Sequence, residues 1–241
     1  MSYSTDLGLY IDGSWRTGEG RDTHSVINPA TGETLAELPL ATAADLDEAL
    51  AATAKGFAHW RVVDVNARAA ILHKVADHIR ERAETIAVLL TTEQGKPLAE
   101  ARTEVLSCAA QFDYFCEEAK RSYGRVLVRP TGQRALVLKQ PVGPVAAFSP
   151  WNFPIQLAFG PLMQVLAAGN RAMIKPSEFT ERTSELMAKL TAEYFAPEEV
   201  AVVTGSPEVA AAFSSLPFDH LVFTGSTATG RRVMQAAAAN L

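Results

Sequence analysis

The chain has 241 residues, of which 48% are hydrophobic and 20% charged, and its formal net charge at pH 7 is -5. This length and apolar content predict one large or two small globular domains with a substantial core. The interspersed charges argue against a nucleic-acid interface, and no apolar run reaches the roughly 20 residues of a membrane span. The segment from Met1 to Asp6 lacks the basic and apolar regions of a signal peptide, so we expect a cytoplasmic location.

The first zone, to about residue 61, begins with the signal of a short hairpin. Asp12-Gly13 separates an apolar run at 9–11 from Ser14-Trp15, and such a pair is typical of a two-residue turn. A second turn is predicted at 28–32, where the sequence reads Asn-Pro-Ala-Thr-Gly.

A helix is predicted to follow, with Thr42 as its N-terminal cap and Asp45 at the capping-box position. Its core-facing side is predicted from four residues at helical spacing, Leu46, Leu50, Thr53 and Phe57.

The second zone, residues 66–123, is predicted to be mostly helical, with a break at Gly95-Lys96-Pro97. His73 and His78 have no metal-binding partners in this pattern, so we expect both on a solvated helix face. The apolar stripe of this zone consists of Leu72, Val75 and Ile79.

The two cysteines, Cys108 and Cys116, fall on one predicted helix. Eight residues of helix separate them by about 12 Å, too far for a disulfide. Neither has an adjacent base or a helix N-terminus that would activate a thiol. Both are therefore expected to be small core residues.

Residues 125–129 and 134–139 are two strand-like runs joined across a Pro-Thr-Gly-Gln turn. They predict a projecting hairpin whose apolar residues need a partner surface.

The third zone, from Val142 to Leu241, alternates strands and helices, which predicts an α/β fold with a parallel sheet wrapped by helices. The predicted strands are 145–149, 171–175, 200–204 and 220–224. The predicted helices lie near 155–168, 181–195, 207–216 and 228–240. Because ligands of such sheets bind beyond the carboxyl ends of the strands, the segments at 149–152, 175–178, 205–206 and 225–226 are predicted to form one crevice.

The turn from Gly225 to Gly230 has the features of a nucleotide phosphate site. It lies between a buried strand and a helix, where glycines allow close backbone approach and the helix N-terminus offers free N–H groups. Arg231 and Arg232 stand where a P-loop needs Lys and Ser or Thr, which disfavours an NTPase, and the dinucleotide fingerprint G-x-G-x-x-G is absent. By spacing alone, a plain strand-to-helix corner remains the alternative.

Five motifs in order resemble the NAD(P)-dependent aldehyde dehydrogenase superfamily over residues 10–241. They are Asn28-Pro29-Ala30-Thr31-Gly32-Glu33, Glu93-Gln94-Gly95-Lys96-Pro97, Pro150-Trp151-Asn152-Phe153-Pro154, Lys175-Pro176-Ser177-Glu178 and Phe223-Thr224-Gly225-Ser226-Thr227. The resemblance is mixed, with features of the succinate-semialdehyde branch and of the coniferyl-aldehyde and class 3 branch. It implies a Rossmann-like sheet with helices on both faces and NAD as cofactor, with NADP possible.

The resemblance also implies the cofactor-binding residues. Lys175 and Glu178 correspond to positions that hydrogen-bond the adenosine ribose, and a carboxylate at Glu178 repels a 2′-phosphate, which favours NAD. Ser226 corresponds to a pyrophosphate-binding position, and Thr229 stands on the adenine side, where a branched aliphatic residue is common. The remaining implied groove residues are Phe148, Ser149, Pro150 and Trp151 on the nicotinamide side, with Ser177, Gly205 and Gly225.

Asn152 corresponds to the position whose side-chain amide stabilises the oxyanion formed when a cysteine thiolate attacks the aldehyde. An N-terminal cap of the following helix is the structural alternative for this residue. The cysteine and the general-base glutamate of the family lie beyond residue 241, so we expect these 241 residues alone to be inactive.

The predicted organisation is an incomplete NAD(P)-binding domain at 1–122 and 142–241, with an oligomerisation hairpin at 123–141. The complete enzyme would oxidise an aldehyde substrate as a homo-oligomer, with no nucleic-acid or membrane partner and no metal. The alternative is a non-catalytic module that binds a nucleotide or docks a partner through the hairpin.

Overall fold

The computed structural model describes residues 9–11, 14–16, 18–128, 131–196 and 198–240. The predicted Asp12-Gly13 turn, the segment from Met1 to Asp6, and Arg129 and Pro130 of the hairpin turn lie outside the described residues. Within the described residues, no helix is both long and apolar enough to cross a membrane.

The N-terminal part consists of two antiparallel strand pairs and a helix. Strands β1 (Leu9–Ile11) and β2 (Ser14–Arg16) pair, as do β3 (Thr23–Ile27) and β4 (Thr34–Pro39). The predicted turn at 28–32 joins β3 to β4, with Gly32 in the left-handed region at φ 75°. The predicted turn at 28–32 therefore connects two paired strands.

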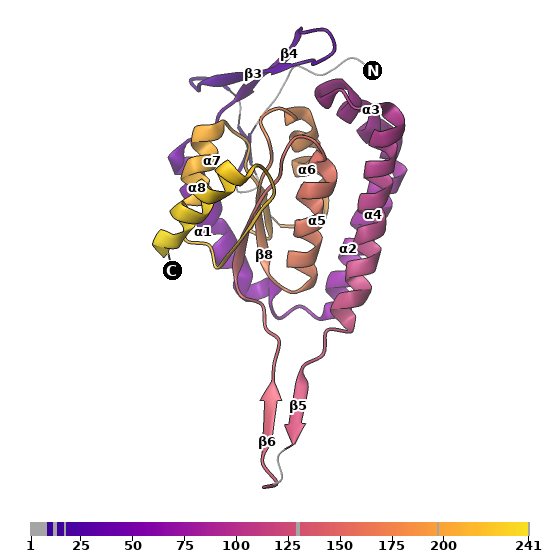
Figure 1. The fold of residues 1–241 in the computed structure, drawn as a ribbon, viewed down its shortest axis with the longest axis vertical. Helices are drawn as coiled ribbons and strands as arrows, with labels where there is room; N and C mark the ends of the chain where they lie inside the picture. Colours follow the sequence, from indigo (N-terminus) through magenta and orange to yellow (C-terminus); the bar gives the residue numbers. More distant parts are fainter. Residues whose placement is uncertain (1–8, 12–13, 17, 129–130, 197, 241) are drawn as a thin grey trace.

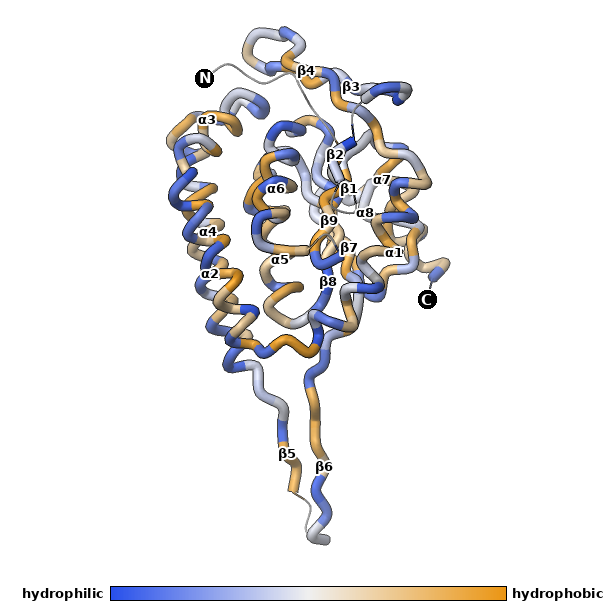
Figure 2. Tube along the Cα trace, turned by 180° about the vertical axis from the view of Figure 1, so that it is seen from behind, coloured by the Kyte–Doolittle hydropathy of each residue, from blue (hydrophilic) through white to orange (hydrophobic). Residues whose placement is uncertain are grey.

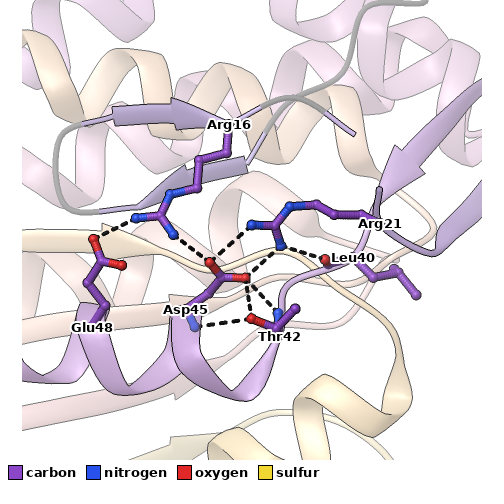
Figure 3. Close-up of polar contacts among 6 residues, drawn as sticks. All are labelled: Arg16, Arg21, Leu40, Thr42, Asp45 and Glu48. Carbon is purple, nitrogen blue, oxygen red and sulfur yellow. Dashed lines mark hydrogen bonds and ion pairs between the residues drawn. The ribbon is translucent and has the colours of Figure 1, made fainter. Parts of the chain in front are cut away.

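Helix α1 (Ala43–Trp60) begins with the predicted capping box between Thr42 and Asp45. Figure 3 shows that Arg16 of β2 and Arg21 also reach this carboxylate, each at 2.6 Å. Burial alone would raise the pKa of Asp45, but hydrogen bonds from Arg21 and Thr42 outweigh it and hold the pKa well below its usual range. One carboxylate thus caps α1 and ties it to the preceding strands.

Three helices form the next part of the chain, α2 (Val65–Glu81), α3 (Ala83–Gln94) and α4 (Leu98–Lys120). Helix α5 (Pro154–Ala167), from later in the chain, packs against them. The predicted break falls between α3 and α4, where Gly95 ends α3 at φ 82°. Cys108 and Cys116 are fully buried on α4, as predicted.

The prediction for His78 is wrong. Its side chain is only 9% exposed, because α2 packs on α6 (Glu181–Tyr194) and brings the Tyr194 hydroxyl to 2.8 Å from Nδ1 of His78. Glu193 lies 3.2 Å from the same nitrogen. His73 is half-buried, with Nδ1 2.7 Å from Asp113. His78 therefore does not lie on a solvated face, because it contacts a helix more than a hundred residues further along the chain.

The central sheet is parallel, with strand order β10-β7-β8-β9. Its strands are β7 (Pro144–Phe148), β8 (Arg171–Lys175), β9 (Val200–Val202) and β10 (His220–Phe223). The helices that follow them are α5, α6, α7 (Pro207–Ser214) and α8 (Thr227–Ala237), which ends in a 3₁₀ turn at Ala238–Asn240. The alternation of strand and helix is therefore as predicted.

Helices cover both faces of the sheet (Figure 1). Alternate strand residues divide between two cores, because side chains of a strand point to opposite faces. Val145, Ala172 and Ile174 pack with α2 to α6, whereas Ala146 and Met173 pack with α1, α7 and α8. The fold is the predicted α/β, Rossmann-like architecture.

Strands β5 (Arg125–Val128) and β6 (Arg134–Val137) form an antiparallel hairpin that projects from the body (Figures 1 and 2). Both strands include hydrophobic residues, and these side chains are exposed: Val126, Val128 and Leu136 are at least 62% accessible. The projecting hairpin was predicted from the sequence.

Candidate functional site

The strand order places a topological switch point at the carboxyl ends of β7 and β10. From β7 the chain proceeds through β8 and β9 on one side, then returns to add β10 on the other side of β7. At such a switch point the connections leave neighbouring strands in opposite directions and open a ligand site. The four predicted segments all follow strands of this sheet and share its carboxyl edge.

The segment after β7 changes from buried to exposed within four residues. Phe148 is buried and packs edge-on against Phe213, with ring centroids 5.1 Å apart. Ser149 is also buried, and its Oγ has no hydrogen-bond partner among the described residues. Trp151 is 50% exposed and Asn152 is exposed. The last two side chains of this segment are thus available to a ligand.

The main chain around Asn152 is held from the turn between α3 and α4. Nζ of Lys96 donates to the Asn152 carbonyl oxygen at 2.7 Å and lies 4.1 Å from the centroid of the Phe153 ring. The same ammonium forms a buried ion pair with Glu104 of α4. Oε1 of Glu104 accepts the main-chain N–H groups of Ile155 and Gln156 at 3.0 and 3.2 Å. Glu104, rather than Asn152, therefore caps α5.

The segment after β8 holds Lys175, Ser177 and Glu178. Lys175 is 3% exposed and its Nζ donates to the Pro176 carbonyl oxygen at 2.6 Å. Ser177 is buried and Glu178 half-buried, with 3.4 Å between Oγ of Ser177 and Oε2 of Glu178. In this structure the Lys175 ammonium is directed onto its own loop.

A second buried glutamate, Glu93, caps helix α6. Its carboxylate accepts the main-chain N–H groups of Arg182 and Thr183 at 2.6 and 2.9 Å, and the Thr183 hydroxyl at 2.6 Å. Glu93 comes from the last turn of α3 and Glu104 from α4, so two consecutive helices cap the helices that follow β8 and β7.

Glu181, in the first turn of α6, is fully enclosed beside Lys175. Neither of its carboxylate oxygens has a hydrogen-bond partner among the described residues. Burial raises the pKa of Glu181 well above its usual value and lowers that of Lys175, and the attraction between the two groups only partly offsets this. The strand end at β8 thus contains two strongly perturbed ionisable groups.

The ends of β9 and β10 contain the predicted glycines. Gly205 is buried at φ 149°, and an added Cβ would lie 2.8 Å from a methyl of Val209. Gly225 is exposed, and an added Cβ would lie 2.6 Å from the Phe223 ring. Ser226 caps α8 by accepting the Thr229 N–H at 3.2 Å. Both Ser226 and Thr229 are exposed, so the first turn of α8 is accessible.

Sequence reasoning found the strand-end residues but missed the residues behind them. Glu93 and Lys96 belong to a motif that it noted without a role, and Glu104 and Glu181 gave no signal. An apolar hollow of about 430 Å³ beside Trp151 and Phe179 was also missed.

Unpartnered polar groups lie at the carboxyl edge of the sheet. The buried Oγ of Ser149, after β7, and the buried Oγ1 of Thr204, after β9, have no hydrogen-bond partner within the described residues. The exposed N-terminus of α8 after Gly225 suits a phosphate.

The two cysteines are far less suited to chemistry. Burial raises the pKa of the Cys116 thiol to about 11, and it also raises that of Cys108, with Glu104 adding to the effect. A thiol with a raised pKa has little of the reactive thiolate at neutral pH. No group of three metal-binding side chains occurs in the part of the chain that the structure describes.

Residues 15–241 match the model of the aldehyde dehydrogenase family. The chain is 44% identical over 236 residues to 4-(hydroxymethyl)benzenesulfonate dehydrogenase of Comamonas testosteroni, covering 97% of this chain and 50% of that protein. It is 40% identical over 233 residues to a mitochondrial succinate-semialdehyde dehydrogenase of Oryza sativa subsp. japonica, covering 95% and 44%. Over 110 residues, 46% of this chain and 23% of the relative, it is 59% identical to coniferyl aldehyde dehydrogenase of Pseudomonas sp..

Solved structures show the same likeness. An NADP-dependent enzyme of E. coli superposes with a TM-score of 0.92 at 34% identity, covering 98% of this chain and 50% of the other. PnpE in complex with nicotinamide adenine dinucleotide superposes with a TM-score of 0.91 at 35% identity, covering 98% and 49%. Nearly all of this chain is thus covered by these matches, but the chain spans only about half the length of the matched proteins.

Proposed function

Because the chain belongs to the aldehyde dehydrogenase family, we propose that it forms the dinucleotide-binding part of an enzyme that oxidises an aldehyde to a carboxylic acid with NAD. The observation that carries this proposal is the strand order, which brings four chemistry-bearing segments to the carboxyl edge of one sheet. The proposed dinucleotide-binding domain comprises residues 1–122 and 142–241.

Each proposed contact follows from the position of a segment. The exposed first turn of α8 with Ser226 binds the pyrophosphate, and Thr229 packs near the adenine. Lys175 and Glu178 bind the adenosine ribose once Lys175 has left its loop carbonyl. The groove residues are Phe148, Ser149, Pro150, Trp151, Ser177, Gly205 and Gly225.

Glu178 favours NAD over NADP in this proposal. Its half-buried carboxylate stands at the ribose end and repels the 2′-phosphate of NADP. The preference is moderate, because among the described residues the Glu178 side chain has one hydrogen-bond contact, at 3.4 Å from Oγ of Ser177, and can turn away.

Asn152 supplies the oxyanion donor. Its exposed side-chain amide hydrogen-bonds the substrate oxygen when a nucleophile adds to the aldehyde carbonyl, and such a donor typically contributes about 10²- to 10³-fold in rate. The bound nicotinamide supplies the acceptor for the hydride.

The nucleophile and the general base come from outside these 241 residues. Cys108 and Cys116 are fully buried thiols with raised pKa, so neither can attack a substrate in the crevice. The 241-residue chain alone therefore binds the dinucleotide without oxidising an aldehyde.

Calorimetry with NAD and NADP, followed by an absorbance assay for NADH on addition of an aldehyde, tests this proposal. We expect binding of NAD, weaker binding of NADP and no turnover. Glu178→Gln should narrow the difference between the two cofactors, whereas the exposed Lys74→Met should leave both affinities unchanged. Failure to bind either cofactor would contradict the binding role, and NADH formation would contradict the missing nucleophile.

A second candidate function is a non-catalytic module that docks a partner through the hairpin at 123–141, proposed also as the oligomerisation element. The exposed apolar cross-strand pair Val126 and Leu136 favours it. Light scattering should show an oligomer that the double substitution Val126→Ser and Leu136→Ser dissociates without changing the melting temperature. An unchanged molar mass would argue against docking through this hairpin.

A further inference from the structure

Asn152 has an exposed side chain on a short segment, yet a hydrogen-bond donor in catalysis must be held in a fixed direction. Among the described residues nothing hydrogen-bonds its side-chain amide. Any constraint on that amide must therefore come through the main chain of residues 152–156.

The contacts to that main chain come from two buried charged residues. Lys96 is 7% and Glu104 2% exposed. Together they contact four of the five residues from 152 to 156: the Asn152 oxygen, the Phe153 ring, and the N–H groups of Ile155 and Gln156. Gln94 adds a longer hydrogen bond of 3.4 Å to the Asn152 oxygen.

The role of Lys96 exceeds helix capping. Glu104 alone satisfies the two free N–H groups of α5, and a carboxylate at a helix N-terminus is already favoured by the helix dipole. The buried ammonium of Lys96 nevertheless contacts the peptide oxygen of Asn152 and the neighbouring Phe153 ring. An ion pair in the protein interior gives little net stability, which leaves orientation of the loop as its evident effect.

We propose that Lys96 and Glu104 are positioning residues for Asn152, which fix its peptide plane and so direct its side-chain amide toward the reacting oxygen. The catalytic part of this inference, the direction of the amide toward a reacting oxygen, rests on the proposed function. The fixing of the loop can be measured on the 241-residue chain without any reaction.

The first experiment measures, by NMR, ¹⁵N order parameters of the Phe153 main-chain amide, which shares a peptide plane with the Asn152 carbonyl, and of the Asn152 side-chain amide. In the native chain the main-chain value should be near 0.85, as in rigid backbone, and in Lys96→Met both values should fall, the main-chain value to below about 0.6. The double variant Lys96→Met with Glu104→Gln removes both charges and keeps an acceptor for the α5 N–H groups. This double variant should fold even where Lys96→Met alone does not, but Asn152 should still be less ordered than in the native chain.

Matched controls are Lys74→Met and Glu100→Gln, which change exposed residues of the same types on α2 and α4. Both should keep native order at Asn152. An Asn152 that stays rigid in folded Lys96→Met and in the double variant would overturn the proposal.

The second experiment is a double-mutant cycle that combines Lys96→Met with Asn152→Ala in the protein at its natural length. Lys96→Met should lower kcat about 10-fold with NAD affinity unchanged, and should cause no further loss when Asn152 is already Ala. Additive losses would overturn the positioning role. If the native protein oxidises no aldehyde, the proposed function fails, while the order parameters still decide whether Lys96 and Glu104 hold the loop.

Discussion

The two halves of the candidate site are held in different ways. We call the loops after β7 and β8 (149–153 and 176–180) the braced side, because Glu104 and Glu93 cap the helices that follow them from 51 and 89 residues away in the sequence. The open side is the segment 224–230 after β10, where α8 is capped by its own exposed Ser226. On the braced side, each helix after a strand is thus capped by a buried residue that is distant in the sequence. On the open side, the helix is capped by its own exposed residue.

The difference follows from neighbours rather than from the turns themselves. Strands β7 and β8 are central, and their helices α5 and α6 pack under α2 to α4. Strand β10 is an edge strand, and among the described residues of α8 only Val233 is buried. Substitutions on the braced side should therefore change stability far more than those on the open side.

The largest effect is expected from Glu104→Ala. It leaves Lys96 buried without its partner and removes the acceptor of two α5 N–H groups. We expect a loss of about 3–5 kcal/mol in the free energy of unfolding, measured with urea. The exposed Glu100→Ala on the same helix should stay within about 0.5 kcal/mol. Equal losses in the two variants would remove the basis for a braced side.

An intermediate case is Asp45, a local cap that two distant arginines also hold. Asp45→Asn should cost about 2 kcal/mol at pH 7, since hydrogen bonds to charged groups contribute roughly that much. Because the folded-state pKa of Asp45 is lowered, its contribution is present above the ordinary value of 3.8 and is lost as the pH falls through the folded-state value.

Urea unfolding of the native chain and of Asp45→Asn at several pH values measures this contribution. The difference between them should shrink below about pH 4, while the exposed Asp47→Asn should match the native chain throughout. A difference that persists at low pH would show that the charge of Asp45 is not what stabilises α1.

A smaller effect is expected on the open side from Ser226→Ala. The variant loses the cap of α8, and a lost N-terminal cap typically costs about 1 kcal/mol. Thr227→Ala, at the next exposed position, serves as the control. A loss as large as that of Glu104→Ala would make the two sides energetically alike.

The smallest effect is expected from Thr229→Val. Its hydroxyl lies 2.9 Å from Oγ of Ser226, but both side chains are exposed and the Thr229 N–H still completes the cap. The change in unfolding free energy should stay within about 0.5 kcal/mol by urea denaturation. A loss above 1 kcal/mol would show that the open side depends on this side-chain contact.

Local patterns predicted most of the fold. The capping box at Thr42, the break at Gly95, the hairpin at 125–137 and the strand-helix alternation after 142 each depend on residues close in sequence. His78 was mispredicted because its burial depends on Tyr194, which no local pattern indicates.

For the candidate site, the sequence indicated which segments lie at strand ends but not what holds them. Glu93 and Glu104 sit in helices whose pattern gives no reason to point a carboxylate inward. Their partners are N–H groups of helices that begin at Pro154 and Glu181, and only packing brings those N–H groups within reach.

The sequence by itself determined most elements, the turn at Gly225-Ser226 and the family, because these follow from spacing, turn chemistry and ordered motifs. The predicted turn was too long, since Gly230 lies within α8, which begins at Thr227. The tertiary structure alone decided the strand order, the burial of His78, and the bracing of Asn152 by Lys96 and Glu104. The physical reason is that a buried charge is tolerated only where distant partners satisfy it, and folding alone brings those partners together.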